Sequence, residues 1–219
     1  MARLLFEKRG NAVWISHLDL MRLFQRAFKR AGLNLKHSQG FNPRPSVSIA
    51  LPLSVGVESV CEILDFELEE YSADHEGICQ KLNEALVAGV RVLKVYDSGR
   101  KIKDLALMRC QVKLEYDRGY DEFTLGAVDS LFRNSSVVVE KKGKNGIVQQ
   151  DIIPMIRKLD VVALDANTVC LDAVICCQNP SLNPAQLVAA VQAYLPQYTP
   201  DHSVCSRLEI FDMNETIFR

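Results

Sequence analysis

Positive charge gathers in one stretch of the sequence, in a pattern that could hold an anion. Neither Asp nor Glu occurs between Asp19 and Glu58. Because the whole chain has a net charge of −1, the six positive charges of this interval leave a net charge of −7 for the rest. Such an asymmetry favours an anionic partner, for example nucleic acid. The cationic residues of the interval are Arg22, Arg26, Lys29, Arg30, Lys36 and Arg44.

A helix is predicted to carry the first four of these charges. Ser16 is a good N-cap with Asp19 three residues later, as in a capping box, and Gly32 supplies the stop. The spacing places the four cations within about a third of the helix circumference. Like charges this close repel one another and favour an anionic ligand, whereas the alternative is a solvated face with Asp19 as counter-ion. The predicted buried stripe is Leu20, Leu23, Phe24, Ala27 and Ala31.

Two prolines stiffen the loop that follows, SQGFNPRP. Pro43 and Pro45 fix their own φ and push Asn42 and Arg44 away from helical conformation. The loop could therefore hold a phosphate, a carboxylate or an unstacked base. In the alternative, Phe41 plugs the core and the prolines only shape the crossing to the next strand. The loop residues predicted to bind RNA or another anion are Ser38, Gln39, Gly40, Phe41, Asn42 and Arg44.

The segment SHLDL contains the residue types of a hydrolytic triad. Ser16 is already explained as a cap and Asp19 as its partner, while a triad needs members that converge from separate directions. His17 is therefore only a weak catalytic candidate, as an anion ligand or a proton-transfer group in a site shared with Arg44. The chain has no Walker A motif, dinucleotide glycine fingerprint, HExxH or paired-carboxylate signature, so we expect no metal site and more readily a binding protein than an enzyme.

Composition predicts a cytoplasmic protein without membrane segments. Apolar residues make up 48% of the chain, but no apolar run approaches the roughly 20 residues that span a bilayer. The start MARLLFEKRG lacks the apolar segment of a signal peptide. Seven cysteines without a CxxC predict buried, reduced thiols rather than a zinc or iron–sulfur site.

The order of predicted elements indicates an α+β fold of two ferredoxin-like halves with antiparallel sheets. The first half, 1–100, is predicted to have the order β-α-β-β-α-β, with RLLFEK as its first strand and VRVLKVY as its last. The segment AVWIS either continues the first strand or forms a hairpin with it. The second half, 101–219, is predicted to repeat this order, with MRCQVKLEY, SVVVEKK, NTVCLDAVIC and SRLEIF as strands and GKNG as a turn. Segment 147–160 fits least well and is expected to be an insertion with a short helix after Pro154. The halves form either two units or one compact domain.

The first quarter of the chain resembles the radical-SAM-associated, or radical-SAM-linked, domain of unknown function in its stand-alone form. The resemblance implies an accessory role beside a radical SAM protein, plausibly on RNA. The iron–sulfur cluster and S-adenosylmethionine would belong to that partner, because this chain lacks a CxxxCxxC motif and is expected to carry no cofactor. The residues that match the family's pattern are Ser16, His17, Leu18, Asp19, Arg26, Ser38, Gly40, Phe41, Asn42, Pro43, Pro45 and Gly56.

The residue patterns, together with what the resemblance implies about a radical SAM partner, leave three functions open. The first is an accessory RNA-binding module that works with a radical SAM enzyme in RNA modification or processing, the basic helix contacting phosphates and the loop an exposed base. The second is a protein adaptor that docks on the radical SAM partner without RNA contact. The third is a metal-independent enzyme that cleaves or modifies RNA, with His17 as acid or base.

Overall fold

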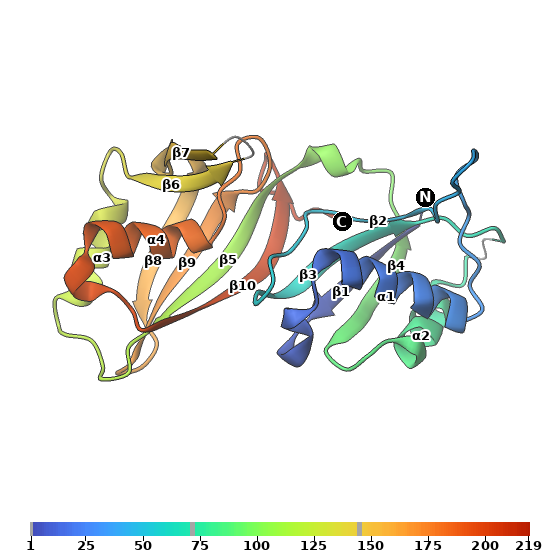
Figure 1. The fold of residues 1–219 in the computed structure, drawn as a ribbon, viewed down its shortest axis with the longest axis horizontal. Helices are drawn as coiled ribbons and strands as arrows, with labels where there is room; N and C mark the ends of the chain where they lie inside the picture. The colour runs from blue at the N-terminus through green and yellow to red at the C-terminus, as the bar shows by residue number, and fades with distance from the viewer. Residues whose placement is uncertain (1, 71–72, 144–145) are drawn as a thin grey trace. The chain divides into compact units, whose positions relative to one another are not determined.

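Alternating apolar residues begin the chain and form the first strand of a mixed α/β fold with antiparallel sheets (Figure 1). The computed structural model describes residues 2–70, 73–143 and 146–219. The chain divides into two compact units, Met1–Asp104 with Arg219 as unit 1 and Leu105–Phe218 as unit 2. Four α-helices lie in the described part of the chain, two in each unit. No helix among these residues is long and apolar enough to cross a membrane.

Unit 1 is a four-stranded antiparallel sheet in the order β4-β1-β3-β2, with two α-helices. The segment expected to extend or return the first strand is instead a 3-10 helix, η1, which ends at Trp14. The elements are β1 (Ala2–Lys8), η1 (Gly10–Trp14), α1 (His17–Arg30), β2 (Val47–Ile49), β3 (Glu58–Phe66), α2 (His75–Ala85), β4 (Val90–Asp97) and η2 (Ile102–Asp104).

The core of unit 1 joins both helices to the sheet and fixes which face of α1 meets solvent. Phe24 of α1 packs edge-on against Phe6 of β1, with ring centroids 4.8 Å apart, and Phe28 lies 5.0 Å from Phe66 of β3. Phe28, which the predicted buried stripe left out, is fully buried. Leu23, which that stripe included, is only half-buried. Because this core holds one side of α1, the basic side is turned outward.

The predicted N-cap of α1 is confirmed. The Asp19 amide donates to Ser16 Oγ at 3.2 Å, and the Ser16 hydroxyl donates to Asp19 Oδ2 at 2.8 Å. The hydrogen bond from Ser16, followed by that from Arg22, lowers the pKa of Asp19. A carboxylate near the helix N-terminus also interacts favourably with the helix dipole.

Replacing Ser16 by Ala is expected to lower the free energy of unfolding by about 1 kcal/mol, because an amide of the first turn loses its acceptor. The Asp19 contribution is complete above the unfolded pKa of 3.8 and disappears as pH falls through the lowered pKa of the folded state. Urea unfolding at neutral pH and near pH 3 measures both effects. Equal stability of Ser16→Ala and wild type at neutral pH would contradict the assignment of this cap.

Unit 2 has a four-stranded antiparallel sheet in the order β10-β5-β9-β8, and a separate hairpin, β6-β7. Two residues of the predicted GKNG turn, 144 and 145, lie outside the described residues. The elements are β5 (Leu105–Glu115), α3 (Thr124–Phe132), β6 (Val138–Gly143), β7 (Gly146–Asp151), η3 (Ile153–Met155), β8 (Ile156–Ala163), β9 (Thr168–Cys176), α4 (Ala185–Tyr194), η4 (Pro196–Tyr198) and β10 (His202–Asp212).

The prediction for segment 147–160 is wrong in its secondary structure. The predicted strand SVVVEKK forms β6, which pairs with β7 and takes no part in the larger sheet. The short helix expected after Pro154 is only the 3-10 helix η3, and β8 begins directly after it. The described side chains of β8 are exposed or half-buried, and Lys158 pairs with Asp160 at 2.9 Å. The apolar and polar residues of this edge strand do not alternate regularly in IRKLDVVA, which is why periodicity missed it.

Candidate functional site

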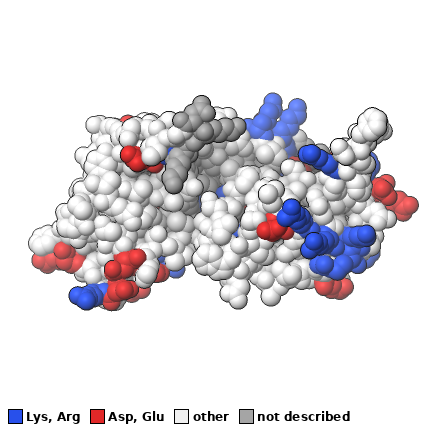
Figure 2. Space-filling view, in the orientation of Figure 1, with Lys and Arg blue, Asp and Glu red and all other residues white. Residues whose placement is uncertain are grey.

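One side of α1 is a cationic surface formed by Arg22, Arg26, Lys29 and Arg30, all exposed. Figure 2 shows Lys and Arg side chains gathered over α1. The Arg22 guanidinium donates to Asp19 Oδ1 at 3.0 Å, and Arg30 Nη2 donates to the carbonyl of Ala85 at 2.5 Å. Asp19 therefore pairs directly with Arg22, and its charge acts on Arg26 only at longer range.

Arg26 and Lys29, in the middle of this surface, expose their charged groups to solvent. Arg26 and Lys29 form no ion pair and no side-chain hydrogen bond with any described residue. They lie three residues apart, so their side chains project from neighbouring positions on one side of the helix. An anion binding here would displace only water, and no internal salt bridge would have to break.

The proline loop folds back on itself as a short arm, here called the proline arm (37–45). His37 and Pro45 form an antiparallel bridge at its base, and the Ser46 amide donates to the Lys36 carbonyl at 2.7 Å. Ser38 and Arg44 are joined twice, by the Ser38 amide to the Arg44 carbonyl at 2.8 Å and by the Arg44 amide to Ser38 Oγ at 2.9 Å. Ser38 thus shapes the arm through its backbone and its hydroxyl.

The tip of the proline arm presents an aromatic ring to solvent. Phe41 has a relative exposure of 105%, so the alternative in which it plugs the core is wrong. Gly40 before it has φ +129°, a conformation that side chains other than glycine rarely adopt. Gln39, Asn42 and Arg44 are exposed as well. The arm therefore offers a ring, two amides and a guanidinium to a ligand.

A groove of about 620 Å³ separates the C-terminal half of α1 from the base of the proline arm. Its volume lies in the range of small-molecule sites, roughly 300 to 1,000 Å³, and would accept a nucleotide. Its lining contains both apolar side chains and polar groups, a combination that suits a planar base with hydrogen-bonding edges. The lining residues are Gln25, Phe28, Lys29, Leu33, Asn34, Leu35, His37, Pro45 and Glu69.

Four polar groove residues were missed from the sequence: Gln25, Asn34, His37 and Glu69. Gln25 lies on the predicted helix beside Arg26, and its spacing of four residues from Lys29 could have identified it as a neighbour of the basic residues. Glu69 is brought to Asn34 by tertiary pairing, since its amide donates to the Asn34 carbonyl at 2.9 Å next to the Leu35–Leu68 bridge. No local sequence pattern predicts that contact.

His17 does not share a site with Arg44. His17 is the first residue of α1, whose 14 residues extend about 21 Å at 1.5 Å per residue. The proline arm follows the other end of the helix (Figure 1). His17 is half-buried, and its imidazole forms no hydrogen bond or ion pair with the part of the chain that is described. The predicted acid–base role in a shared site is therefore not supported by the geometry.

Trp14 is an aromatic residue at the start of α1 that sequence reasoning assigned to a strand. It ends η1 with a relative exposure of 70%. The fully buried Lys8 donates from Nζ to the carbonyls on either side of it, Val13 at 3.1 Å and Ile15 at 2.9 Å. Burial lowers the pKa of Lys8, partly offset by the Glu62 carboxylate.

No group of three or more His, Cys, Asp or Glu side chains suited to a metal ion occurs among the residues with described positions. The seven cysteines, all of which are described, are free thiols, and burial raises the pKa of Cys110 and Cys177 to about 12. Thiols with so high a pKa are poor nucleophiles and metal ligands at neutral pH.

Comparison with known proteins gives a family and a fold. The model of the family described as "Uncharacterized protein conserved in bacteria (DUF2344)" matches residues 2–184. No curated protein matches the chain.

Two of the solved structures that are similar in fold belong to RNA–protein assemblies or their components. A chain in the crystal structure of a Cbf5-Nop10-Gar1 complex has a TM-score of 0.54 at 9% identity, over 99% of this chain and 51% of that one. A chain in the structure of an H/ACA RNP bound to a substrate RNA containing 2'-deoxyuridine has a TM-score of 0.52 at 8% identity, over 99% and 50%. This protein thus spans about half the length of those chains, and identities this low indicate a shared fold only.

Proposed function

The chain belongs to DUF2344, a family of uncharacterized proteins conserved in bacteria, and we propose that it is an accessory RNA-binding module. The observation that carries the proposal is the cationic surface of α1, where Arg26 and Lys29 face solvent without a partner among the described residues and the helix leads to a groove of nucleotide size. Such a surface suits a phosphate backbone, which sets the position of a nucleic acid without reading its sequence.

The groove and the proline arm offer contacts to bases, which the cations of α1 do not provide. Unpaired RNA bases bind to aromatic rings and to side chains that meet their hydrogen-bonding edges. Phe41 offers the ring, while Asn34 and Gln25 offer amides in the groove beside Lys29. We therefore propose that the backbone lies on α1 and that at least one base enters the groove or contacts the arm.

We also propose that each unit is a ferredoxin-like half. Unit 1 has the order β-α-β-β-α-β with sheet order β4-β1-β3-β2, and unit 2 repeats it as β10-β5-β9-β8 once the hairpin β6-β7 is set aside. The similar chain in an RNA-bound H/ACA RNP is consistent with an RNA-handling role, although a fold by itself does not define a function.

The resemblance to the radical-SAM-associated domain supports a more specific proposal, in which this module presents RNA to a radical SAM protein for modification or processing. The iron–sulfur cluster and S-adenosylmethionine would be held by that partner. Co-purification of the full chain with such an enzyme, and stimulation of that enzyme on RNA, tests this part separately from RNA binding.

The salt dependence of RNA binding tests the proposal that the cationic surface of α1 binds RNA. If the four cations of α1 neutralise four phosphates of a single strand, affinity should fall roughly 50-fold between about 50 and 200 mM salt, and Arg26→Ala should weaken binding and reduce the logarithmic slope by about 0.7. Fluorescence anisotropy with labelled transfer RNA and a labelled single strand measures both.

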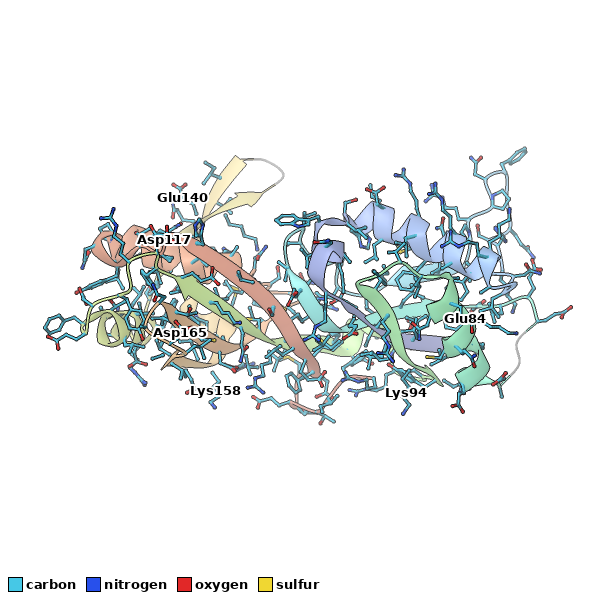
Figure 3. The ribbon with its side chains drawn as sticks, turned by 90° about the horizontal axis from the view of Figure 1, so that it is seen from below. Glu84, Lys94, Asp117, Glu140, Lys158 and Asp165 are labelled. Atoms are coloured by element: carbon cyan, nitrogen blue, oxygen red, sulfur yellow. The ribbon has the colours of Figure 1, made fainter. Side chains whose placement is uncertain are left out.

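Lys94→Ala is the matched control, because Lys94 is an exposed cation of β4 on the side of the sheet opposite α1 (Figure 3). Its affinity should equal that of wild type. Absence of binding at the lowest salt would refute the RNA proposal and favour a protein adaptor.

A further inference from the structure

Two aromatic side chains of unit 1 face solvent at opposite ends of α1. Trp14, two residues before the N-cap, has a relative exposure of 70%, and Phe41 at the tip of the proline arm has 105%. The other aromatic residues described in unit 1 are buried or half-buried. The cationic surface lies between the two exposed rings along the helix.

Trp14 is held outward by contacts of its own backbone neighbours. The Val13 carbonyl accepts from Lys8 Nζ at 3.1 Å and from the Gly56 amide at 2.9 Å, and the Ile15 carbonyl accepts from Lys8 Nζ at 2.9 Å. Because Lys8 and Val13 are buried, η1 cannot rotate to bring the indole into the core without breaking these bonds. The backbone that carries the exposed ring is therefore pre-organised, which reduces the entropy lost on binding.

Phe41 is held outward in a different way. The bridge between His37 and Pro45 and the paired bonds between Ser38 and Arg44 close the base of the proline arm. Pro43 further limits the backbone between Phe41 and that base. Both rings consequently stand on stiff supports at the two ends of one basic helix.

We infer that the RNA bound along α1 is single-stranded, with one unpaired base stacked on Trp14, another on Phe41, and the intervening backbone on Arg26 and Lys29. This inference rests on the proposed function. Bases of a duplex are already stacked and paired, so a duplex could offer this surface only its phosphates. Exposed rings combined with a cationic track are typical of sites for single strands, where stacking tolerates any base.

The experiment uses the full chain and a labelled uridine strand of about 12 nucleotides, compared with a duplex of the same length. We expect tighter binding of the single strand and quenching of the tryptophan fluorescence, which comes from Trp14 as the single tryptophan of the sequence. Phe41→Ala should weaken single-strand binding roughly fivefold to hundredfold and leave duplex binding unchanged, as expected for loss of one stacked base.

Phe123→Ala is the matched control, since Phe123 is an exposed ring of unit 2 with a relative exposure of 65%. Its affinities should equal those of wild type. Equal affinity for single strand and duplex, without quenching and without an effect of Phe41→Ala, would overturn this inference and leave the proposed RNA binding intact. Failure of both nucleic acids to bind would overturn both.

Discussion

Exchange of both Arg26 and Lys29 for Glu is expected to reduce the affinity of the full chain for RNA at least about 100-fold at low salt. Each substitution removes a phosphate contact and adds a negative charge that repels the backbone within a Debye length. Both side chains are exposed and unpaired within the described structure, so folding should be unaffected. Anisotropy titrations measure the affinity, and urea unfolding checks that the variant is folded.

The control for this experiment carries the same change in charge at another place. Arg91 and Lys94 are exposed cations on β4, and Figure 3 shows Lys94 on the side of the sheet opposite α1. The double variant Arg91→Glu/Lys94→Glu should lose only the small, salt-screened part of affinity that follows net charge. If both double variants lose affinity equally, the cationic surface of α1 is not the binding site.

Replacement of Lys8 by Ala is expected to have the largest effect on stability, a loss of about 3 kcal/mol in the free energy of unfolding. The ammonium satisfies the carbonyls of Val13 and Ile15, and its removal leaves these buried acceptors unsatisfied and takes away a positive charge that interacts with Glu62. Lys8 is fully buried, so its stem is lost from the packing as well. Urea unfolding, followed by Trp14 fluorescence and by circular dichroism, measures the loss.

Lys8→Met separates the ammonium from the stem. It keeps most of the packing volume, so the difference between the Met and Ala variants reports packing, and the difference between wild type and Met reports the charge. Since burial lowers the pKa of Lys8 below 10.5, the unfolded chain binds more protons between the two pKa values. Wild type should therefore gain stability relative to Lys8→Met as pH rises toward 10.5. A constant difference would contradict a lowered pKa.

Lys8 also connects stability to the proposed site. Its hydrogen bonds hold the backbone on both sides of Trp14, whose indole we infer to stack on a base. A folded Lys8→Met protein should consequently keep the cationic surface of α1 intact while η1 loosens. Nothing in the sequence marks Lys8 for this role, because an isolated lysine in an alternating strand is usually exposed.

The sequence by itself determined the parts of the site that depend on neighbours along the chain. The cap formed by Ser16 and Asp19, and the arrangement of Arg22, Arg26 and Lys29 on one side of a helix, follow from spacing because a helix repeats every 3.6 residues. The stiffness of the arm follows from Pro43 and Pro45, whose rings restrict the backbone wherever they occur. Mixed helices and antiparallel strands also followed from local periodicity.

Only the tertiary structure decided which side chains face solvent and which distant residues meet. Phe41 and Trp14 are apolar and could equally have been core residues, but Phe24, Phe28 and Phe66 already fill that core. Glu69 reaches the groove because β-type pairing carries it to Asn34. Burial and contact depend on residues that are far apart in sequence and close in space, and a local sequence pattern does not show which residues these are.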